Sequence, residues 1–131
     1  MSGLCQPVAD EQLKSVLTEV GLEAAVTREG GLDAERDWAQ VLSPGDLQAL
    51  TFVRLLLASP RFAFLDDPTK VIEPPLAERL YQALAHSSIA YVTTSCPASL
   101  LSRHDMQLEL HEDGTWQLGP AGANGQPEDA V

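Results

Sequence analysis

One stretch, residues 42–67, limits the possible folds more than any other part of the sequence. Ser43 is a favourable N-cap, Pro44 suits the first position of a helix, and Asp46 places a negative charge near the positive end of the helix dipole. Pro60 ends the helical pattern. These residues predict a helix with a defined start and a defined stop.

An apolar run follows the proline. Residues 62–65 are all apolar and too few for a helix, so they predict a strand that is buried on both faces and ends in Asp66 and Asp67. A helix that begins at Pro74 and a β-branched, aromatic strand over residues 89–94 come next. A strand, a helix and a strand in this order form a right-handed parallel unit. The predicted fold class is therefore α/β, with a small, partly parallel sheet and flanking helices.

The two ends of the chain add a helix and a C-terminal antiparallel hairpin. Apolar residues recur on one helical face between Asp10 and Gly21, so an amphipathic helix capped by Asp10 is predicted. Residues 106–110 alternate as in a half-buried strand, and Asp113-Gly114 is a hairpin signal before a returning strand at 115–118. The predicted organisation is a flexible lead-in at 1–9, a single α/β domain at 10–118 and a disordered acidic tail at 119–131.

The acidic composition excludes two classes of partner. The 131 residues carry a net charge of −11, whereas nucleic acids and anionic membrane surfaces bind clustered Lys and Arg. No apolar run approaches the roughly 18 residues of a membrane-spanning helix, and the N-terminus lacks the pattern of a signal peptide. Cys5 and Cys96 are therefore expected to be reduced thiols in a cytoplasmic protein.

The order of these features resembles the signature helix and Walker B strand of ATP-binding-cassette (ABC) transporter ATPases, of the peroxisomal and vitamin B12 transporter type. The family signature reads Leu-Ser-Gly-Gly-Glu or Leu-Ser-Pro-Gly-Glu, and its counterpart here is Leu42, Ser43, Pro44, Gly45 and Asp46. Further matching segments are Gly30-Gly31-Leu32-Asp33, Asp37-Trp38, Leu80-Tyr81, Ser99-Leu100-Leu101 and His104-Asp105. The resemblance covers roughly residues 8–118 and implies the helical subdomain and the Walker B half of a cassette ATPase.

The phosphate-binding loop of that family is missing from the sequence. The loop reads Gly-x-x-x-x-Gly-Lys-Ser/Thr, because main-chain amides and the lysine hold the phosphates of ATP. Lys14-Ser15 is the only Lys-Ser pair, and no glycines stand at the required distance before it. By resemblance, the strand that carries the loop would lie between two of the strands retained here. Its absence would leave strand edges unpaired, so a homo-oligomer or a second protein chain is expected.

Other positions also differ from the family pattern. Asp67 stands in place of the catalytic Glu, and its shorter carboxylate would misplace an attacking water at a cost on the order of a hundredfold in rate. Cys96 replaces the switch His, and a thiol is not a cation at neutral pH. Lys70 and Glu73 replace the Ser and Asp of the D-loop, and Ala49 replaces an Arg. These departures imply a degenerate domain, for which we expect no autonomous ATPase activity, no catalytic residue, no cofactor and no metal.

Polar side chains end both predicted parallel strands. They are Asp66, Asp67, Thr94, Ser95 and Cys96. The carboxyl ends of neighbouring parallel strands face a common crevice, so a pocket for a small polar ligand, or for a metal on Asp66, is one hypothesis. The alternative is that Asp66 caps a turn and that Cys96 is a small buried apolar residue.

Two smaller hypotheses concern histidines. Cys96 and His104 would suit a nucleophile and its base, but a separation of eight residues does not fix their distance in space. His86, His104 and His111 show no metal-ligand spacing, so solvated or helix-end roles are expected.

Two functions of different classes remain open. The first is a catalytically incompetent remnant of a cassette ATPase that acts through self-association or a partner protein. In the family, the helix start that corresponds to Ser43–Gly45 reaches the γ-phosphate held by an opposite subunit, and this chain could offer that surface to an intact partner. The second is a ligand-binding module or repurposed small enzyme that uses the crevice at Asp66, Asp67, Ser95 and Cys96. A truncated reading frame without selected activity is a third possibility.

Overall fold

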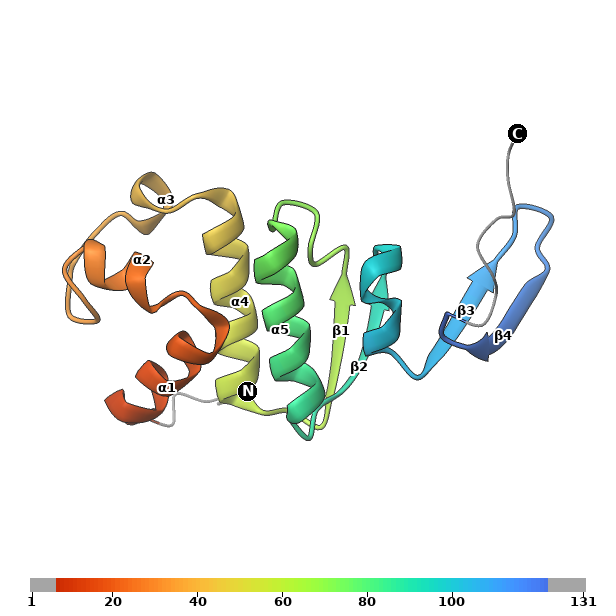
Figure 1. The fold of residues 1–131 in the computed structure, drawn as a ribbon, viewed down its shortest axis with the longest axis horizontal. Coiled ribbons are helices and arrows are strands. Elements are labelled where there is room, and N and C mark those ends of the chain that lie inside the picture. The colour runs from red at the N-terminus through yellow and green to blue at the C-terminus, as the bar shows by residue number, and fades with distance from the viewer. Residues whose placement is uncertain (1–6, 123–131) are drawn as a thin grey trace, which may run out of the picture. The chain divides into compact units, whose positions relative to one another are not determined.

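The computed structural model describes residues 7–122, and Figure 1 shows the fold as a ribbon. The chain forms two compact units, the first ending at Thr94 and the second beginning at Ser95. Helices and a parallel pair of strands make up the first unit, and a 3-10 helix and a hairpin make up the second. The predicted α/β fold class is confirmed. The sequence-based domain limits at residues 10 and 118 stay a prediction.

In the described part of the first unit, four helices precede the first strand, and one further helix separates the two strands. Its elements are α1 (Asp10–Val20), α2 (Glu23–Arg28), α3 (Trp38–Val41), α4 (Pro44–Ala58), β1 (Phe62–Asp66), α5 (Pro74–His86) and β2 (Ala90–Thr94). Between residues 7 and 122, no helix combines the length and the apolar character needed to cross a membrane.

Helix α1 begins one residue earlier than predicted, at Asp10 itself. Its N-cap is Ala9, whose side chain accepts no hydrogen bond, and Asp10 is the first helical residue. The prediction that Asp10 caps this helix is therefore wrong, although its charge still lies near the positive end of the helix dipole. Gly21 closes the helix with a φ of 81°, a left-handed conformation that glycine adopts without strain. The predicted stop at Gly21 is confirmed.

Helix α4 has the start that its sequence predicts. The Oγ of Ser43 accepts a hydrogen bond of 3.0 Å from the backbone amide of Asp46, and Pro44 is the first helical residue. At the other end, Ser59 has a φ of 43° and Pro60 follows it, so the helix cannot continue. Both predicted limits of this helix are confirmed.

The core of the first unit lies between α1, α4 and α5. Its fully buried side chains include Val20 of α1 and Leu80, Tyr81 and Leu84 of α5. Phe52 of α4 is also buried, and its ring stands edge-on to that of Tyr81 with 6.0 Å between their centroids. Burial of these large apolar groups is the main driving force for folding this unit.

Strands β1 and β2 pair in parallel, with Phe62 opposite Ala90 and Asp66 opposite Thr94. The Tyr81 ring of α5 lies 5.9 Å from that of Tyr91, and its hydroxyl is 3.2 Å from the hydroxyl of Thr93. Helix α5 therefore packs on the face of the sheet that carries alternate residues of β2. The predicted parallel pair is confirmed.

The other face of this sheet is exposed. Phe62 is 76% exposed, Phe64 72% and Val92 58%, whereas Ala63 and Leu65 are half-buried. The prediction that β1 is buried on both faces is therefore wrong. A strand is buried on both faces only where other elements cover both faces of its sheet. Among the described residues, the helices cover only one face.

The second unit holds η1 (Ala98–Arg103), β3 (Met106–Leu110) and β4 (Trp116–Pro120). β3 and β4 pair antiparallel around the turn with Gly114, as predicted, and β4 runs to Pro120 rather than Leu118. The apolar side chains of β3 are exposed, so the prediction of a half-buried strand is wrong for the described residues. Residues 123–131 of the predicted tail lie outside the described residues, as do residues 1–6 of the lead-in, Cys5 included.

Candidate functional site

The carboxyl ends of β1 and β2 meet at a hydrogen-bonded pair of side chains. Thr94 Oγ1 donates a hydrogen bond of 2.6 Å to Asp66 Oδ1, and it accepts one of 3.2 Å from the backbone amide of Asp67. This proximity follows from the parallel register, which places Asp66 opposite Thr94. Asp66, Asp67 and Thr94 are therefore brought together as the sequence predicts.

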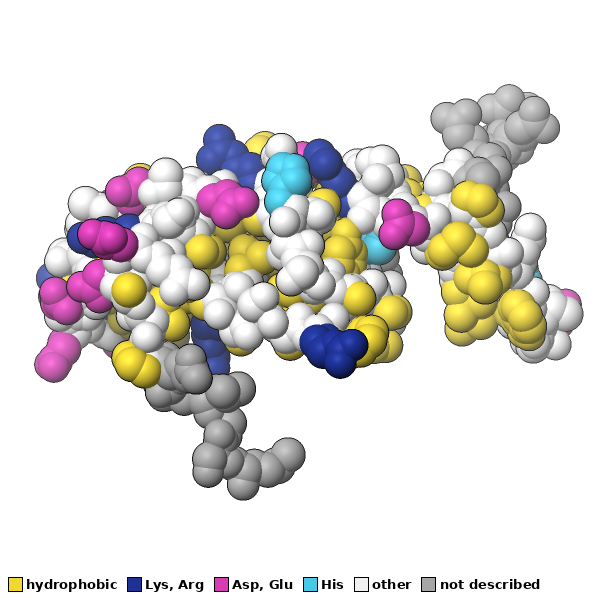
Figure 2. Space-filling model, turned by 90° about the horizontal axis from the view of Figure 1, so that it is seen from below, with side chains coloured by type: hydrophobic (Ala, Val, Ile, Leu, Met, Phe, Trp, Pro, Cys, Tyr) yellow, Lys and Arg dark blue, Asp and Glu magenta, His cyan; other side chains and the backbone are white. Residues whose placement is uncertain are grey.

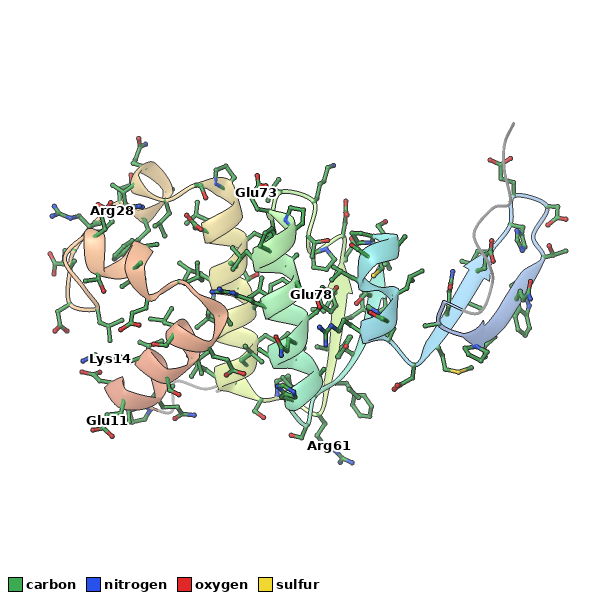
Figure 3. All side chains as sticks on the ribbon, viewed as in Figure 1. Glu11, Lys14, Arg28, Arg61, Glu73 and Glu78 are labelled. Carbon is green, nitrogen blue, oxygen red and sulfur yellow. The ribbon has the colours of Figure 1, made fainter. Side chains whose placement is uncertain are left out.

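The chain leaves both strands through a left-handed residue. Asp67 follows β1 with a φ of 44°, and Ser95 follows β2 with a φ of 53°. Asp tolerates this conformation better than most non-glycine residues. The Asp67 amide is turned toward Thr94 at this bend. Asp66 and Asp67 lie at the carboxyl end of β1, and Arg61, which Figure 3 labels, lies at the start of this strand.

The carboxylates do not make a metal site by themselves. Among residues 7–122, no group of three or more His, Cys, Asp or Glu side chains is arranged to hold a metal ion. A magnesium ion at Asp66 would need phosphate oxygens and water for its other ligands. Because the sequence has no Gly-x-x-x-x-Gly-Lys-Ser/Thr loop to hold those phosphates, the residues present do not fit a complete magnesium–nucleotide site.

Ser95 and Cys96 begin the second unit, and their part in the predicted pocket stays a prediction. Cys96 is half-buried, and this burial raises the pKa of its thiol above the ordinary value. A higher pKa leaves less thiolate at neutral pH, and the thiolate is the nucleophilic form. The raised pKa does not favour an activated nucleophile at Cys96, and a packing role for this residue stays a prediction.

Cys96 and His104 do approach each other, but with the wrong chemistry for a nucleophile and its base. Cys96 Sγ lies 3.9 Å from His104 Nδ1, and the same nitrogen lies 3.0 Å from the carbonyl oxygen of Leu100. A carbonyl oxygen only accepts, so Nδ1 carries the proton in this contact. Nδ1 is then unable to take a proton from the thiol.

The signature-like segment forms the start of α4. Leu42 is buried, Ser43 caps the helix, and Asp46 lies in the first turn. A β-carbon added to Gly45 would lie 2.7 Å from the carbonyl oxygen of Val71, so only glycine fits this approach without a shift of the backbone. This contact between the start of α4 and the chain before α5 has no signal in the sequence.

A second feature that sequence reasoning missed is a hollow among the helices of the first unit. It has a volume of about 240 Å³ and is lined by apolar side chains of α1, α2 and α4, with Trp38 and Arg54 among its lining residues. Trp38 is half-buried and forms part of the wall of this hollow.

Several known proteins are similar to this chain over most of its length. The lysosomal cobalamin transporter ABCD4 of Mus musculus is 35% identical over 111 residues, which is 83% of this chain and 18% of the transporter. An uncharacterized ABC transporter ATP-binding protein of Synechocystis is 32% identical over 116 residues, 88% of this chain and 18% of that protein. ABC transporter D family member 1 of Arabidopsis thaliana is 32% identical over 113 residues, 85% of this chain and 8% of that protein.

The chain spans less than a fifth of the length of each of these relatives. No protein-family model matches the sequence. The similarity is nevertheless shared by transporters of the D subfamily from mammals and plants and by a bacterial ATP-binding protein. The matched part of this chain is therefore an ABC transporter ATPase-like region of the D-subfamily type.

Proposed function

We propose that this chain does not hydrolyse ATP alone and acts by binding a second polypeptide that carries a phosphate-binding loop. Its relatives include an ABC transporter ATP-binding protein. By resemblance, residues 42–46 and 62–67 correspond to the family's signature and Walker B segments. Its own 131 residues contain no Gly-x-x-x-x-Gly-Lys-Ser/Thr sequence. Main-chain amides and a lysine to hold the triphosphate must then come from elsewhere.

The exposed face of the β1–β2 sheet is the observation that carries this proposal. Phe62, Phe64 and Val92 present adjacent apolar side chains there, because Phe64 and Val92 stand opposite each other in the register. Clustered apolar groups of this size on a protein surface mark interaction sites. A partner that covers them would gain the favourable free energy of burying two aromatic rings.

The unpaired edges of the β1–β2 sheet support the proposal separately from its exposed apolar face. In the described part of the chain, β1 and β2 pair only with each other. An edge strand presents unpaired backbone N–H and C=O groups, to which an extended segment of another polypeptide can add as a further strand. Backbone pairing at an edge and apolar packing on the face would act together in one partner.

The test begins with the whole chain in isolation. We expect no ATP turnover above background and no micromolar binding of magnesium-ATP by calorimetry. ATP hydrolysis by the purified chain, or a micromolar dissociation constant, would refute the first half of the proposal.

The second half is tested by co-expression with a segment of an ABC transporter ATP-binding protein that carries the Gly-x-x-x-x-Gly-Lys-Ser/Thr loop. We expect the two chains to elute together with the mass of a 1:1 complex. Phe64→Ser should weaken the complex at least tenfold, whereas Gln82→Ser, at an exposed position of α5, should leave it unchanged. Separate elution of the two wild-type chains at micromolar concentration would contradict the proposal.

A further inference from the structure

The hairpin of the second unit has one wholly apolar face. Its register pairs Met106 with Pro120, Leu108 with Leu118 and Leu110 with Trp116, and directly opposed residues share a face of the sheet. All six of these residues are exposed, including Trp116 at 67% and Leu110 at 73%. Figure 2 shows hydrophobic side chains gathered over the hairpin.

The opposite face of the hairpin is polar. Gln107 pairs with Gly119 and Glu109 with Gln117, so this face suits water. A two-stranded hairpin is marginally stable in water unless its apolar face packs against another layer. The strict separation of apolar and polar residues therefore predicts that a second layer covers one side only.

We propose that this second layer is the same hairpin face of a second copy of the chain, related by a two-fold axis. In a two-fold interface the same surface patch meets itself. The six residues contain no charged group, so two copies meet there without repulsion between like charges. This matters because each chain carries a net charge of −11, which opposes most other contacts between copies.

The distribution of acidic residues around the hairpin fits this arrangement. Glu109 lies on the polar face, and Glu112 and Asp113 lie in the turn beyond β3. In a dimer joined through the apolar faces, these carboxylates remain at the rim or on the outside, where they keep their water. The dimer therefore buries apolar surface and leaves these charges hydrated.

The size of the face suits a modest dimer. Five large side chains that are each more than half exposed offer roughly 600 Å² of apolar surface per copy, or about 1,200 Å² in total. This total lies at the lower end of the range for specific interfaces. Two antiparallel sheets packed face to face stand about 10 Å apart, which lets Trp116 of each copy reach the leucines of the other. Trp116 is expected to be the main anchor, because large aromatic groups dominate interface energies.

The first test is the mass of the full chain in solution by light scattering and sedimentation, from about 1 to 200 μM. We expect a shift from one to two times 14.1 kDa over this range. Leu108→Lys or Trp116→Ser should raise the dimer dissociation constant at least tenfold, and Gln117→Lys on the polar face should leave it within about twofold. Cross-strand NMR contacts between β3 and β4 establish that each variant hairpin is folded.

A cross-linking test locates the contact directly. With Cys5 and Cys96 replaced by serine, Leu118→Cys should be joined between copies by a bifunctional thiol-reactive cross-linker that spans about 10 Å, whereas Gln117→Cys on the other face should not. A monomer at all concentrations, or a dimer that survives both Leu108→Lys and Trp116→Ser, overturns the proposal. A dimer that is lost only with Phe64→Ser also overturns it, because contact is then through the β1–β2 sheet. None of these results depends on whether a partner with a phosphate-binding loop binds that sheet.

Discussion

The carbonyl oxygen of Val71 lies so close to Gly45 that a β-carbon at that position would be 2.7 Å from it. Gly45 is in the first turn of α4, and Val71 lies in the segment that leads from β1 to α5. The contact joins the start of the signature-like helix to the chain that follows the two carboxylates. The glycine therefore sets how closely these two parts of the first unit approach.

Gly45→Ala should destabilise the protein for this reason. The added methyl group must displace a backbone carbonyl, which typically costs about 1–3 kcal/mol, and the better helix propensity of alanine offsets less than about 1 kcal/mol. We expect a lower midpoint of urea unfolding with an unchanged slope. Gly119→Ala is the matched control, because nothing lies within 4 Å of a β-carbon there. An unchanged or higher midpoint for Gly45→Ala would show that the segment moves away at no cost.

Thr94→Val should loosen the carboxyl ends of the sheet. The substitution keeps the size of the side chain but removes the donor to Asp66 and the acceptor for the amide of Asp67. We expect a loss of about 1 kcal/mol in the free energy of unfolding and faster hydrogen exchange at the Asp67 amide. Thr94→Ser keeps the hydroxyl and should retain the slow exchange. Equal exchange rates in the valine and serine variants would mean that these hydrogen bonds contribute nothing.

Cys96 should react slowly with iodoacetamide at neutral pH. Burial raises the pKa of its thiol, so the thiolate is scarce until the pH exceeds the ordinary value for cysteine. Because the folded-state pKa is the higher one, the resulting stabilisation is present below the unfolded-state pKa and is lost as the pH rises through the folded-state pKa. In a Cys5→Ser background, we expect alkylation to accelerate in denaturant at the same pH. Reaction as fast in the folded as in the unfolded chain would contradict this.

Thr115→Ala should raise the pKa of Asp113. The Thr115 hydroxyl donates a hydrogen bond of 2.6 Å to Asp113 Oδ1, and the Thr115 amide donates one of 2.9 Å, and both lower the pKa of that carboxyl. A lowered pKa means that the carboxylate stabilises the turn above its unfolded-state pKa and that this is lost as the pH falls through the folded-state pKa. NMR titration of Asp113 measures the shift. Thr115→Ser should keep the low pKa, and equal values in all three proteins would exclude the side-chain hydrogen bond as its cause.

Local signals in the sequence were sufficient for the starts and stops of elements. Ser43 and Pro44 begin α4, and Gly21 closes α1, because capping depends on residues next to the helix end. Asp10 was misassigned as a cap because it is equally favourable one position later, in the first turn. The parallel pairing of β1 and β2 also followed from the order of the elements.

The environment of the strands was not predictable in the same way. Residues 62–65 are apolar without alternation, so nothing in that run tells which side is covered. Which face of the strand is buried depends on the element that packs against it. In this structure that element is α5, and its position is not encoded within residues 62–65. The hairpin face shows the same limit, since Leu108 alternates correctly for a buried face yet is exposed.

Part of the candidate site followed from topology and part did not. Strand ends in register bring Asp66 to Thr94, and this could be foreseen. The contact between Cys96 and His104 could not, because it depends on how η1 folds between them. Use of the strand-end crevice for a small ligand stays a prediction, and so does a cytoplasmic location.

Alternate residues of the five-residue strand β1 have different environments. Ala63 and Leu65 face the helices, whereas Phe62 and Phe64 face away from them. A screen that scores only heat resistance would tolerate polar replacements at the two phenylalanines and reject them at their neighbours. Selection on the two phenylalanines therefore comes from the molecules that bind this face. It is independent of the selection that keeps the chain folded.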